Sequence, residues 1–414
     1  MQVFADLQLH SKYAMATSRD MDLEHLAEGA RTKGLNLLGT GDFTHPKWSS
    51  ELRSKLSPVD GTGLFSYSGM TWMLSGEVST IYEQGGKVRK VHHLLYAPDM
   101  EIVAQANEFL SKFGDLSSDG RPILTGVDSP GLVEGLSAVS PTLFVIPAHA
   151  WTPWFSVFGS RSGFDSLKDC YGDQTSKIFA IETGLSSDPA MNWRISSLDG
   201  VSLISNSDAH SPNPWRLGRE ANAFELQSMT YRGVFDAIRM KDPSRFLYTI
   251  EVDPSYGKYH FTGHRKCGVS LAPSEASRLG NSCPKCGKKM TVGVLQRVDA
   301  LADRPDGFTP RTAIPFKRLL PLYEVISSST GVNRLYAKSV LDLQARLLRA
   351  FGNELAVLLR TSEEDLARVV PPKVARAVVA SREGRLKVTP GYDGVYGVPE
   401  LEGEAADPGR PILE

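Results

Sequence analysis

Cysteine is scarce in this sequence, with only four in 414 residues. So few thiols exclude a disulfide framework as the source of stability and favour a reducing, intracellular compartment. Long apolar runs are also missing, because none reaches the roughly 18–20 residues of a membrane-spanning helix. The opening MQVFADLQLH lacks the charged and apolar segments of a secretory signal peptide. We therefore expect a cytoplasmic protein without a membrane partner.

The chain as a whole has almost no excess of positive or negative charge, since its net charge is −1. The distribution is uneven, however: residues 255–360 hold 17 Lys and Arg against 7 Asp and Glu, and the rest holds 29 against 40. A basic part beside an acidic part fits a polyanion-binding region joined to a metal-binding catalytic domain. Ordinary variation along a solvated surface gives the same pattern, so charge alone leaves both interpretations open.

Short apolar runs alternate with helical patterns over residues 1–252. The runs are VFADLQL, LNLLGTG, TLFVIPA, KIFAIET and VSLISNS. This alternation predicts an α/β fold with a parallel sheet or barrel. Residues 253–300 contain a small cysteine module, residues 301–402 read as a mostly helical C-terminal region, and residues 403–414 are predicted to be a disordered tail.

Metal-binding side chains follow several of these apolar runs. In a βα barrel the C-terminal ends of the strands share one face, so such side chains can meet in one site. Each residue alone fits a helix cap or a turn equally well, but together they favour a centre for Zn²⁺, Mn²⁺ or Fe, with Mg²⁺ less suited to the imidazoles. Glu77 is the candidate for bridging two ions. The set is Asp6, His10, Asp42, His45, Glu77, His92, His93, His149, Glu182, Asp208 and His210.

The motifs that carry these residues resemble, in order and spacing, those of the polymerase and histidinol phosphatase (PHP) family. They are ADLQLHSKY, GTGDFTHP, SGEVSTIY, VHHLLYAPD, PAHAWTP, AIETGLSSD and SNSDAHSP. More narrowly, ATSRDM, HPKW, KYHFTGHRKCGV and PGYDGVYG resemble endonuclease Q, a family of DNA repair nucleases. The resemblance implies a distorted βα barrel with two or three divalent ions (Zn²⁺, Mn²⁺ or Mg²⁺). It also implies hydrolysis of DNA 5′ to a deaminated base (uracil, hypoxanthine or xanthine) or an abasic site.

The resemblance assigns residues as well as a reaction. The implied ligands are Asp6, His10, Asp42, His45, Glu77, His92, His149, Asp208 and His210, with catalytic roles for Asp208, Glu77 and His149. His92 is chosen over His93 because neighbouring side chains of a strand point to opposite faces. Gln8 departs from the usual His-x-His of the wider family, which predicts weaker metal binding or an altered metal preference.

The cysteine module has the spacing of a structural zinc site. His264 and Cys267 form one half, and Cys283 and Cys286 form the other, with 15 residues between them. Four ligands close a tetrahedron and leave no open position, so the ion would be structural. Reduced thiols without a metal are the alternative, and His260 is a rival fourth ligand. Cys170 stands alone and is interpreted as a free thiol.

Candidates for substrate binding lie beside these motifs. Trp48 and Trp151 follow the predicted ligands and could stack an extruded base, although packing of the barrel rim would place the same residues there. Arg19 could neutralise a phosphate, or be an ordinary surface charge. Lys266, in the basic cysteine module, could contact DNA phosphates or keep the module soluble.

The sequence is therefore consistent with three functions. The first is a DNA repair endonuclease acting at deaminated bases. The second is a PHP-type small-molecule phosphatase, which explains the metal cluster but neither the cysteine module nor the basic stretch. The third is a non-catalytic DNA-damage-binding protein, which Gln8 motivates. We favour the endonuclease because it explains the metal cluster, the cysteine module and the basic stretch together.

Overall fold

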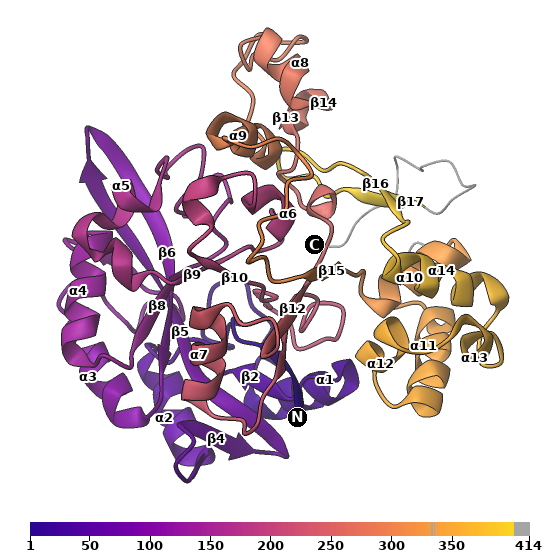
Figure 1. Ribbon diagram of the computed structural model, residues 1–414, viewed down its shortest axis with the longest axis horizontal. Helices are drawn as coiled ribbons and strands as arrows, with labels where there is room; N and C mark the ends of the chain where they lie inside the picture. The colour runs from indigo at the N-terminus through magenta and orange to yellow at the C-terminus, as the bar shows by residue number, and fades with distance from the viewer. Residues whose placement is uncertain (333, 335, 401–414) are drawn as a thin grey trace.

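The computed structural model describes residues 1–332, 334 and 336–400. The tail predicted to be disordered, residues 403–414, lies outside the described residues. An 11-stranded sheet forms the centre of the larger part of the molecule, and a bundle of helices follows it near the C-terminus (Figure 1). The predicted barrel-like α/β fold with a helical C-terminal region is thus confirmed. None of the helices described is long and apolar enough to cross a membrane.

The sheet mixes parallel and antiparallel pairs. Its main path runs β15-β12-β11-β1-β2-β5-β4-β3, and β6, β7 and β8 join through β5. The β1–β2 and β2–β5 pairs are parallel, whereas β1–β11 and β5–β6 are antiparallel. The expectation of a parallel sheet is therefore wrong for part of it. The strands are β1 (Gln2–Asp6), β2 (Leu37–Gly39), β3 (Ser57–Val59), β4 (Leu64–Tyr67), β5 (Met70–Gln84), β6 (Lys87–Ala97), β7 (Ile123–Thr125), β8 (Phe144–Pro147), β11 (Ala221–Glu225), β12 (Phe246–Glu251) and β15 (Phe316–Arg318).

A long hairpin of β5 and β6 projects from this sheet. Its turn is Gly85-Gly86, where both residues have positive φ (63° and 68°). Two such residues fit the tight turns that match strand twist, and glycine adopts them without steric cost. The short parallel strands β9 (Ala180–Glu182) and β10 (Ser202–Ile204) form a separate two-stranded sheet.

Helices cover the outside of the barrel (Figure 1). In α1 (Leu23–Lys33) the sequence sets both ends of the helix. The Asp22 carboxylate accepts from the His25 N–H at its start, and Gly34, with φ 99°, ends it. The described α-helices of this part are α1 (Leu23–Lys33), α2 (Pro46–Lys55), α3 (Met100–Leu110), α4 (Ser129–Val139), α5 (Leu167–Tyr171), α6 (Pro189–Asn192) and α7 (Tyr231–Met240).

The cysteine module projects at one end of the molecule, at the top of Figure 1. It contains β13 (Thr262–His264), β14 (Val269–Leu271), α8 (Pro273–Arg278) and α9 (Val294–Leu301). After the helical bundle the chain returns to the module, since Tyr392 forms a β-bridge with Phe261. The C-terminal elements are α10 (Leu322–Thr330), α11 (Lys338–Phe351), α12 (Glu354–Leu359), α13 (Glu363–Ala367), α14 (Pro372–Arg382), β16 (Lys387–Thr389) and β17 (Val398–Glu400).

A buried ion pair joins the helical bundle to the barrel. Lys33 Nζ of α1 lies 2.7 Å from Glu354 Oε1 of α12, and both side chains are buried. The same carboxylate oxygen accepts from the Leu322 N–H of α10. Removing one partner would leave a buried charge without its counter-ion, so this pair fixes the bundle against α1.

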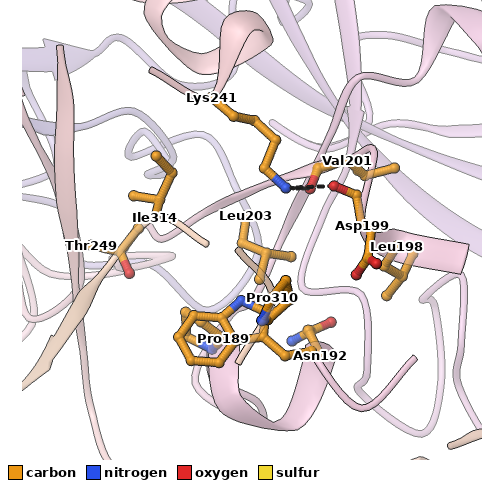
Figure 2. A pocket seen from close by; sticks show the side chains of 11 residues that line it. Pro189, Asn192, Leu198, Asp199, Val201, Leu203, Lys241, Thr249, Pro310 and Ile314 are labelled. Atoms are coloured by element: carbon orange, nitrogen blue, oxygen red, sulfur yellow. Dashed lines mark hydrogen bonds between the residues drawn. The ribbon is translucent and has the colours of Figure 1, made fainter. Parts of the chain in front are cut away.

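A small cavity lies between the barrel and the chain that follows it (Figure 2). Lys241 Nζ donates to the carbonyl oxygens of Asp199 and Val201 beside it, at 2.7 and 3.1 Å. Leu203 and Ile314 add apolar walls. Its volume of about 20 Å³ holds roughly one water molecule, so it is no substrate site.

Candidate active site

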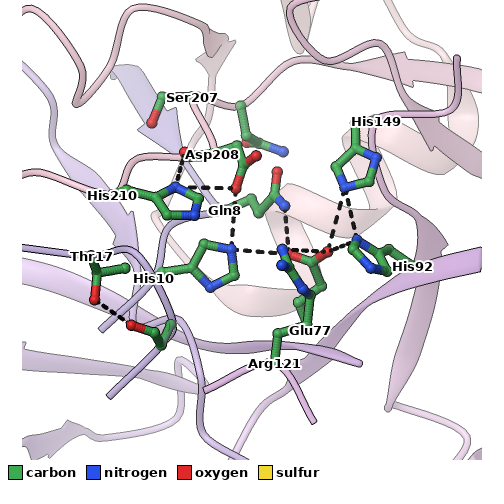
Figure 3. Close-up of polar contacts among 12 residues, drawn as sticks. Gln8, His10, Thr17, Glu77, His92, Arg121, His149, Ser207, Asp208 and His210 are labelled. Atoms are coloured by element: carbon green, nitrogen blue, oxygen red, sulfur yellow. Dashed lines mark hydrogen bonds and ion pairs between the residues drawn. The ribbon is translucent and has the colours of Figure 1, made fainter. Parts of the chain in front are cut away.

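Glu77 lies at the centre of a buried cluster of histidines and carboxylates (Figure 3). Its Oε1 is 2.7 Å from His92 Nδ1 and 3.5 Å from His149 Nε2. Its Oε2 is 3.2 Å from His10 Nε2. The side chains form two groups, and within each group the ligand atoms lie within 4.8 Å of one another. The first group is Glu77, His92 and His149, and the second is His10, Asp208 and His210.

The chemistry of this cluster fits divalent cations. Buried atoms that converge here make no hydrogen bond within the described part of the chain, among them His10 Nε2, Glu77 Oε1 and Asp208 Oδ1. His10 Nε2 and Asp208 Oδ1 are only 3.1 Å apart, but their geometry is not that of a hydrogen bond. Unsatisfied buried donors and acceptors are costly, and a cation between them would remove that cost.

A carboxylate behind His10 sets the orientation of its ring. Asp42 Oδ1 lies 2.9 Å from His10 Nδ1 and accepts its proton, which leaves the lone pair on Nε2 facing Glu77 and Asp208. Metal-binding histidines commonly have such a carboxylate partner. Asp42 also accepts from the Ser11 N–H, so both of its oxygens are used. It therefore supports the cluster from behind and is in neither group of converging ligands.

The β5–β6 hairpin places Glu77 and His92 in mid-strand, whereas the sequence pattern predicts strand ends there. Ser79 pairs with His92 and Glu77 pairs with Leu94, so the two ligands project from one face. His93 projects from the other face, 3.1 Å from both the Thr80 hydroxyl and the Tyr171 hydroxyl. The structure thus brings His92, and not His93, to Glu77.

Three of the predicted ligands have left-handed backbone conformations. The φ angles are 46° at Asp42, 27° at His149 and 48° at Asp208, which lie in the loops that follow β2, β8 and β10. Non-glycine residues rarely adopt such angles, and the strain costs roughly 1–3 kcal/mol each. Gly184 makes one of these turns possible, because a Cβ on it would lie 2.7 Å from His149 Cβ. Strain concentrated in this way is typical of functional sites.

Ser207, next to Asp208, is held from two sides. Asp6 Oδ1 accepts from the Ser207 N–H at 3.0 Å, and Oδ2 accepts from the Ser207 hydroxyl at 2.5 Å and the Gly218 N–H at 2.8 Å. Arg219 Nε and Nη2 donate to the Ser207 carbonyl at 3.1 and 3.0 Å. The structure therefore places Asp6 beside the converging ligands, where it fixes the loop that carries Asp208.

His45 and Glu182 also lie outside the two groups. His45 stacks on Tyr13 at a ring distance of 4.6 Å. Glu182 accepts from the His149 N–H at 2.8 Å and from the Asn206 amide at 2.7 Å, and burial raises its pKa to about 8. These contacts make Glu182 a support for the His149 turn.

Arg121 and Gln8 complete the cluster. Arg121, which no sequence pattern singled out, has Nη1 3.7 Å from Glu77 Oε1. Burial raises the pKa of Glu77, but Arg121 and the surrounding histidines outweigh it and hold that pKa well below its usual range. Burial and Arg121 lower the pKa of His92 to about 3. Gln8 donates to Glu77 Oε2 at 2.8 Å, and its buried Oε1 has no hydrogen-bond partner among the described residues.

An open cavity of about 1110 Å³ adjoins the cluster. Asp208, His210 and His149 form part of its wall on the barrel side. Cationic and aromatic side chains form much of the rest, and they are Arg216, Arg219, Arg265, Lys258, Trp215, Tyr259, Tyr336 and Tyr396. A cavity of this size and polarity can admit a nucleotide or a stretch of DNA strand.

The predicted stacking of a base on Trp48 or Trp151 is wrong. Trp48 is fully buried and its Nε1 donates to the Thr40 and Gly41 carbonyls, while Trp151 is buried and donates to Asn192. Neither ring offers a face to a base, so the alternative, packing of the barrel rim, holds for both. Arg19 and Lys266 are exposed, and their contact with DNA stays a prediction.

The cysteine module forms a second candidate metal site. The ligand atoms of its four predicted residues lie within 4.8 Å of one another, and they are His264, Cys267, Cys283 and Cys286. Burial raises the pKa of Cys283, but hydrogen bonds from Lys285, His264 and Cys286 outweigh it and lower the pKa to about 6. A thiolate is the form that binds metals. His260, the rival ligand, is outside this group, and Cys170 is a buried free thiol.

Comparisons with known proteins agree with this architecture. Residues 321–385 match the model of the MJ0043 C-terminal domain family. The chain is 32% identical over 413 residues to the uncharacterized protein YqxK of Bacillus subtilis, covering 96% of this chain and 98% of that one.

Two solved structures extend the comparison. The lesion-specific endonuclease PfuEndoQ from Pyrococcus furiosus is similar with a TM-score of 0.87 and 37% identity, covering 98% of this chain and 96% of that one. Endonuclease Q in complex with a 27-mer duplex that carries an abasic lesion at the active site also gives 0.87 and 37%, covering 97% of both chains. This chain therefore belongs to the endonuclease Q family.

Proposed function

We propose that this protein is a metal-dependent DNA repair endonuclease that hydrolyses the phosphodiester 5′ to a deaminated base or an abasic site. The observation that carries the proposal is Glu77 between two groups of metal-binding side chains, with Asp208 and His210 opening into a cationic cavity. Membership of the endonuclease Q family supports DNA as the substrate. The complex of that enzyme with an abasic duplex supports a damaged site in particular.

Two or three divalent ions would be held by the two groups, and when bound they would lower the pKa of water and stabilise negative charge on the phosphate. The oxygens of Glu77 face different groups, so one carboxylate can serve both ions. Asp42 keeps the His10 lone pair directed at the cluster. Asp6 and Arg219 hold the strained turn that presents Asp208.

The cavity suits an extruded nucleotide. A deaminated base pairs poorly and leaves the duplex at lower cost than a matched base. Arg216 and Arg265 supply positive charge for the phosphates, and Tyr259 and Tyr396 supply aromatic surface. Exposed basic residues such as Arg19 and Lys266 would contact the flanking backbone without reading sequence.

The cysteine module would hold one structural Zn²⁺. Its His-Cys₃ ligand set leaves no position for substrate, so it would contribute folding energy and not chemistry. The ion would fix β13 to the Cys283–Cys286 turn and thereby fix Lys266, which lies between the ligands His264 and Cys267.

A nicking assay tests the proposal. Purified protein is incubated with duplexes that contain one deoxyuridine, deoxyinosine, deoxyxanthosine or abasic site, with Mn²⁺ or Mg²⁺, and with an undamaged duplex as control. We expect cleavage 5′ to the lesion that EDTA abolishes. Hydrolysis of p-nitrophenyl phosphate without nicking would favour a small-molecule phosphatase, and lesion binding without nicking in any metal would favour a non-catalytic binding protein.

A further inference from the structure

The loop between β1 and α1 carries an exposed apolar side chain beside the active-site cavity. Met15 is 76% exposed, more than any other large apolar side chain in the described residues. The next three residues, Ala16, Thr17 and Ser18, line the cavity together with Asp208 and His210. A single exposed methionine is ordinary on a protein surface, so its meaning depends on how the loop is held.

The loop is tied to the metal-binding cluster itself. The Ser11 N–H at its start donates to Asp42, and the Ser18 N–H near its end donates to the His210 carbonyl at 2.8 Å. Thr17 Oγ1 donates to the Ser11 carbonyl at 2.9 Å and the Ala14 carbonyl at 2.7 Å, which closes the loop on itself.

The tip of the loop is fixed as well. The Met15 N–H donates to Asp119 Oδ2 at 3.2 Å, and Ala16 adopts a left-handed φ of 61°. The tip backbone is therefore held while the side chain is left in water. A flexible loop would lose conformational entropy when Met15 binds a partner, whereas this loop has already lost it on folding.

We propose that Met15 is a wedge that enters the base stack of duplex DNA and fills the space left by the extruded lesion nucleotide. This inference rests on the proposed function. Proteins that unstack DNA commonly insert an unbranched or bulky apolar side chain, methionine included. Because Ser11 and Ser18 couple the loop to Asp42 and His210, the wedge stands at a fixed position relative to the site of cleavage.

Trp154 is another exposed residue near the cavity, beside Tyr259, and it is the less suitable wedge. It is 39% exposed, lies against Tyr259 at 5.9 Å, and has the Arg161 guanidinium 6.0 Å from its ring. These contacts hold the ring on the protein surface. Met15 has the greater exposed surface on a narrower side chain, which suits entry between base pairs.

The test compares duplex and single-stranded substrates for Met15→Ala. A wedge acts only where a stack must be opened, so the variant should nick a deoxyuridine duplex about tenfold more slowly and a single-stranded deoxyuridine oligonucleotide within about twofold of wild type. Fluorescence of 2-aminopurine next to the lesion should rise less on binding. Met15→Leu should retain most of the duplex activity.

Met240→Ala is the matched control, because Met240 is 68% exposed and ends α7, away from the residues that line the cavity. It should change neither substrate. Equal nicking of the duplex by wild type and Met15→Ala would overturn the wedge, as would an equal loss on both substrates. If wild type nicks neither substrate, the proposed function itself fails, which is a separate result.

Discussion

The two candidate metal sites of this protein are built in opposite ways. The cysteine site takes all four ligands from residues 264–286, whereas the barrel site takes its six from residues 10–210. The first is defined by local spacing and needs only two short turns. The second exists only after separate strands and loops have packed, so it depends on the whole barrel.

The sites also differ in what they leave open. The cysteine site offers four ligands for a tetrahedral ion and no free position, as structural zinc sites do. The barrel site opens into a large cavity through Asp208 and His210. We infer that one site holds the fold and the other performs chemistry, and the following substitutions can break or sharpen that contrast.

The largest effect is expected from Asp208→Asn. The change removes the negative charge nearest His10 in the open group while keeping the size of the side chain. Single-turnover nicking of a deoxyuridine duplex should fall by about a thousandfold or more. Affinity for the duplex, measured by fluorescence anisotropy, should stay within about threefold. Nicking within tenfold of wild type would remove Asp208 from the chemistry.

Cys283→Ser should act on stability and not on the barrel site. Loss of one thiolate should reduce zinc content by one ion per chain, lower the melting temperature by about 5 °C or more, and weaken DNA binding. Cys170→Ser is the control, since Cys170 is buried but outside the cysteine site. An unchanged melting temperature and zinc content in Cys283→Ser would argue against a structural ion.

Arg219→Gln tests whether the barrel site depends on its supports. The change removes two donors from the buried Ser207 carbonyl, at a cost of about 1–3 kcal/mol, and lets the Asp208 turn relax. We expect the factor by which kcat falls to be about ten times the factor by which KM rises. Arg219→Lys should have a kcat between those of wild type and Arg219→Gln. A change in KM alone would instead make Arg219 a substrate contact.

The smallest effect concerns His260, the residue that the cysteine site does not use. Burial lowers its pKa to about 4, whereas an unfolded histidine has a pKa of about 6.5. Stability from the neutral ring is therefore complete above pH 6.5 and is lost as the pH falls toward 4.

The free energy of unfolding of wild type should fall between pH 7 and pH 5. In His260→Gln that fall should be smaller by about 1–2 kcal/mol. Denaturant unfolding at both pH values measures the difference. Identical pH dependence in the two proteins would show that His260 is not buried as a neutral ring.

Most of the side chains that the structure brings together were named from the sequence, but their positions in the fold were not predicted. His149 and Asp208 follow short apolar strands, and that position alone singled them out. The structure brings Glu77 and His92 together, but both belong to the interior of a long hairpin. Because β5 is buried on both faces over much of its length, its period-2 alternation is hidden and its true extent could not be read.

The direction in which a side chain points was harder to predict than which residues lie near the site. Trp48 follows His45 closely in sequence, yet α2 turns its ring into the core. Asp6 was expected among the ligands, but the turn after β10 uses both of its oxygens. Arg121 stands in a Gly- and Pro-containing loop, where a charge is normally solvated, and only the parallel pairing of β7 with β5 brings it to Glu77.

Anomalous diffraction from crystals grown with Mn²⁺ tests the central claim most directly. The account predicts at least two peaks on either side of the Glu77 carboxylate, one with His92 and His149 and one with His10 and Asp208. A density map without an ion at either position, in a protein that is folded and bound to DNA, would contradict it.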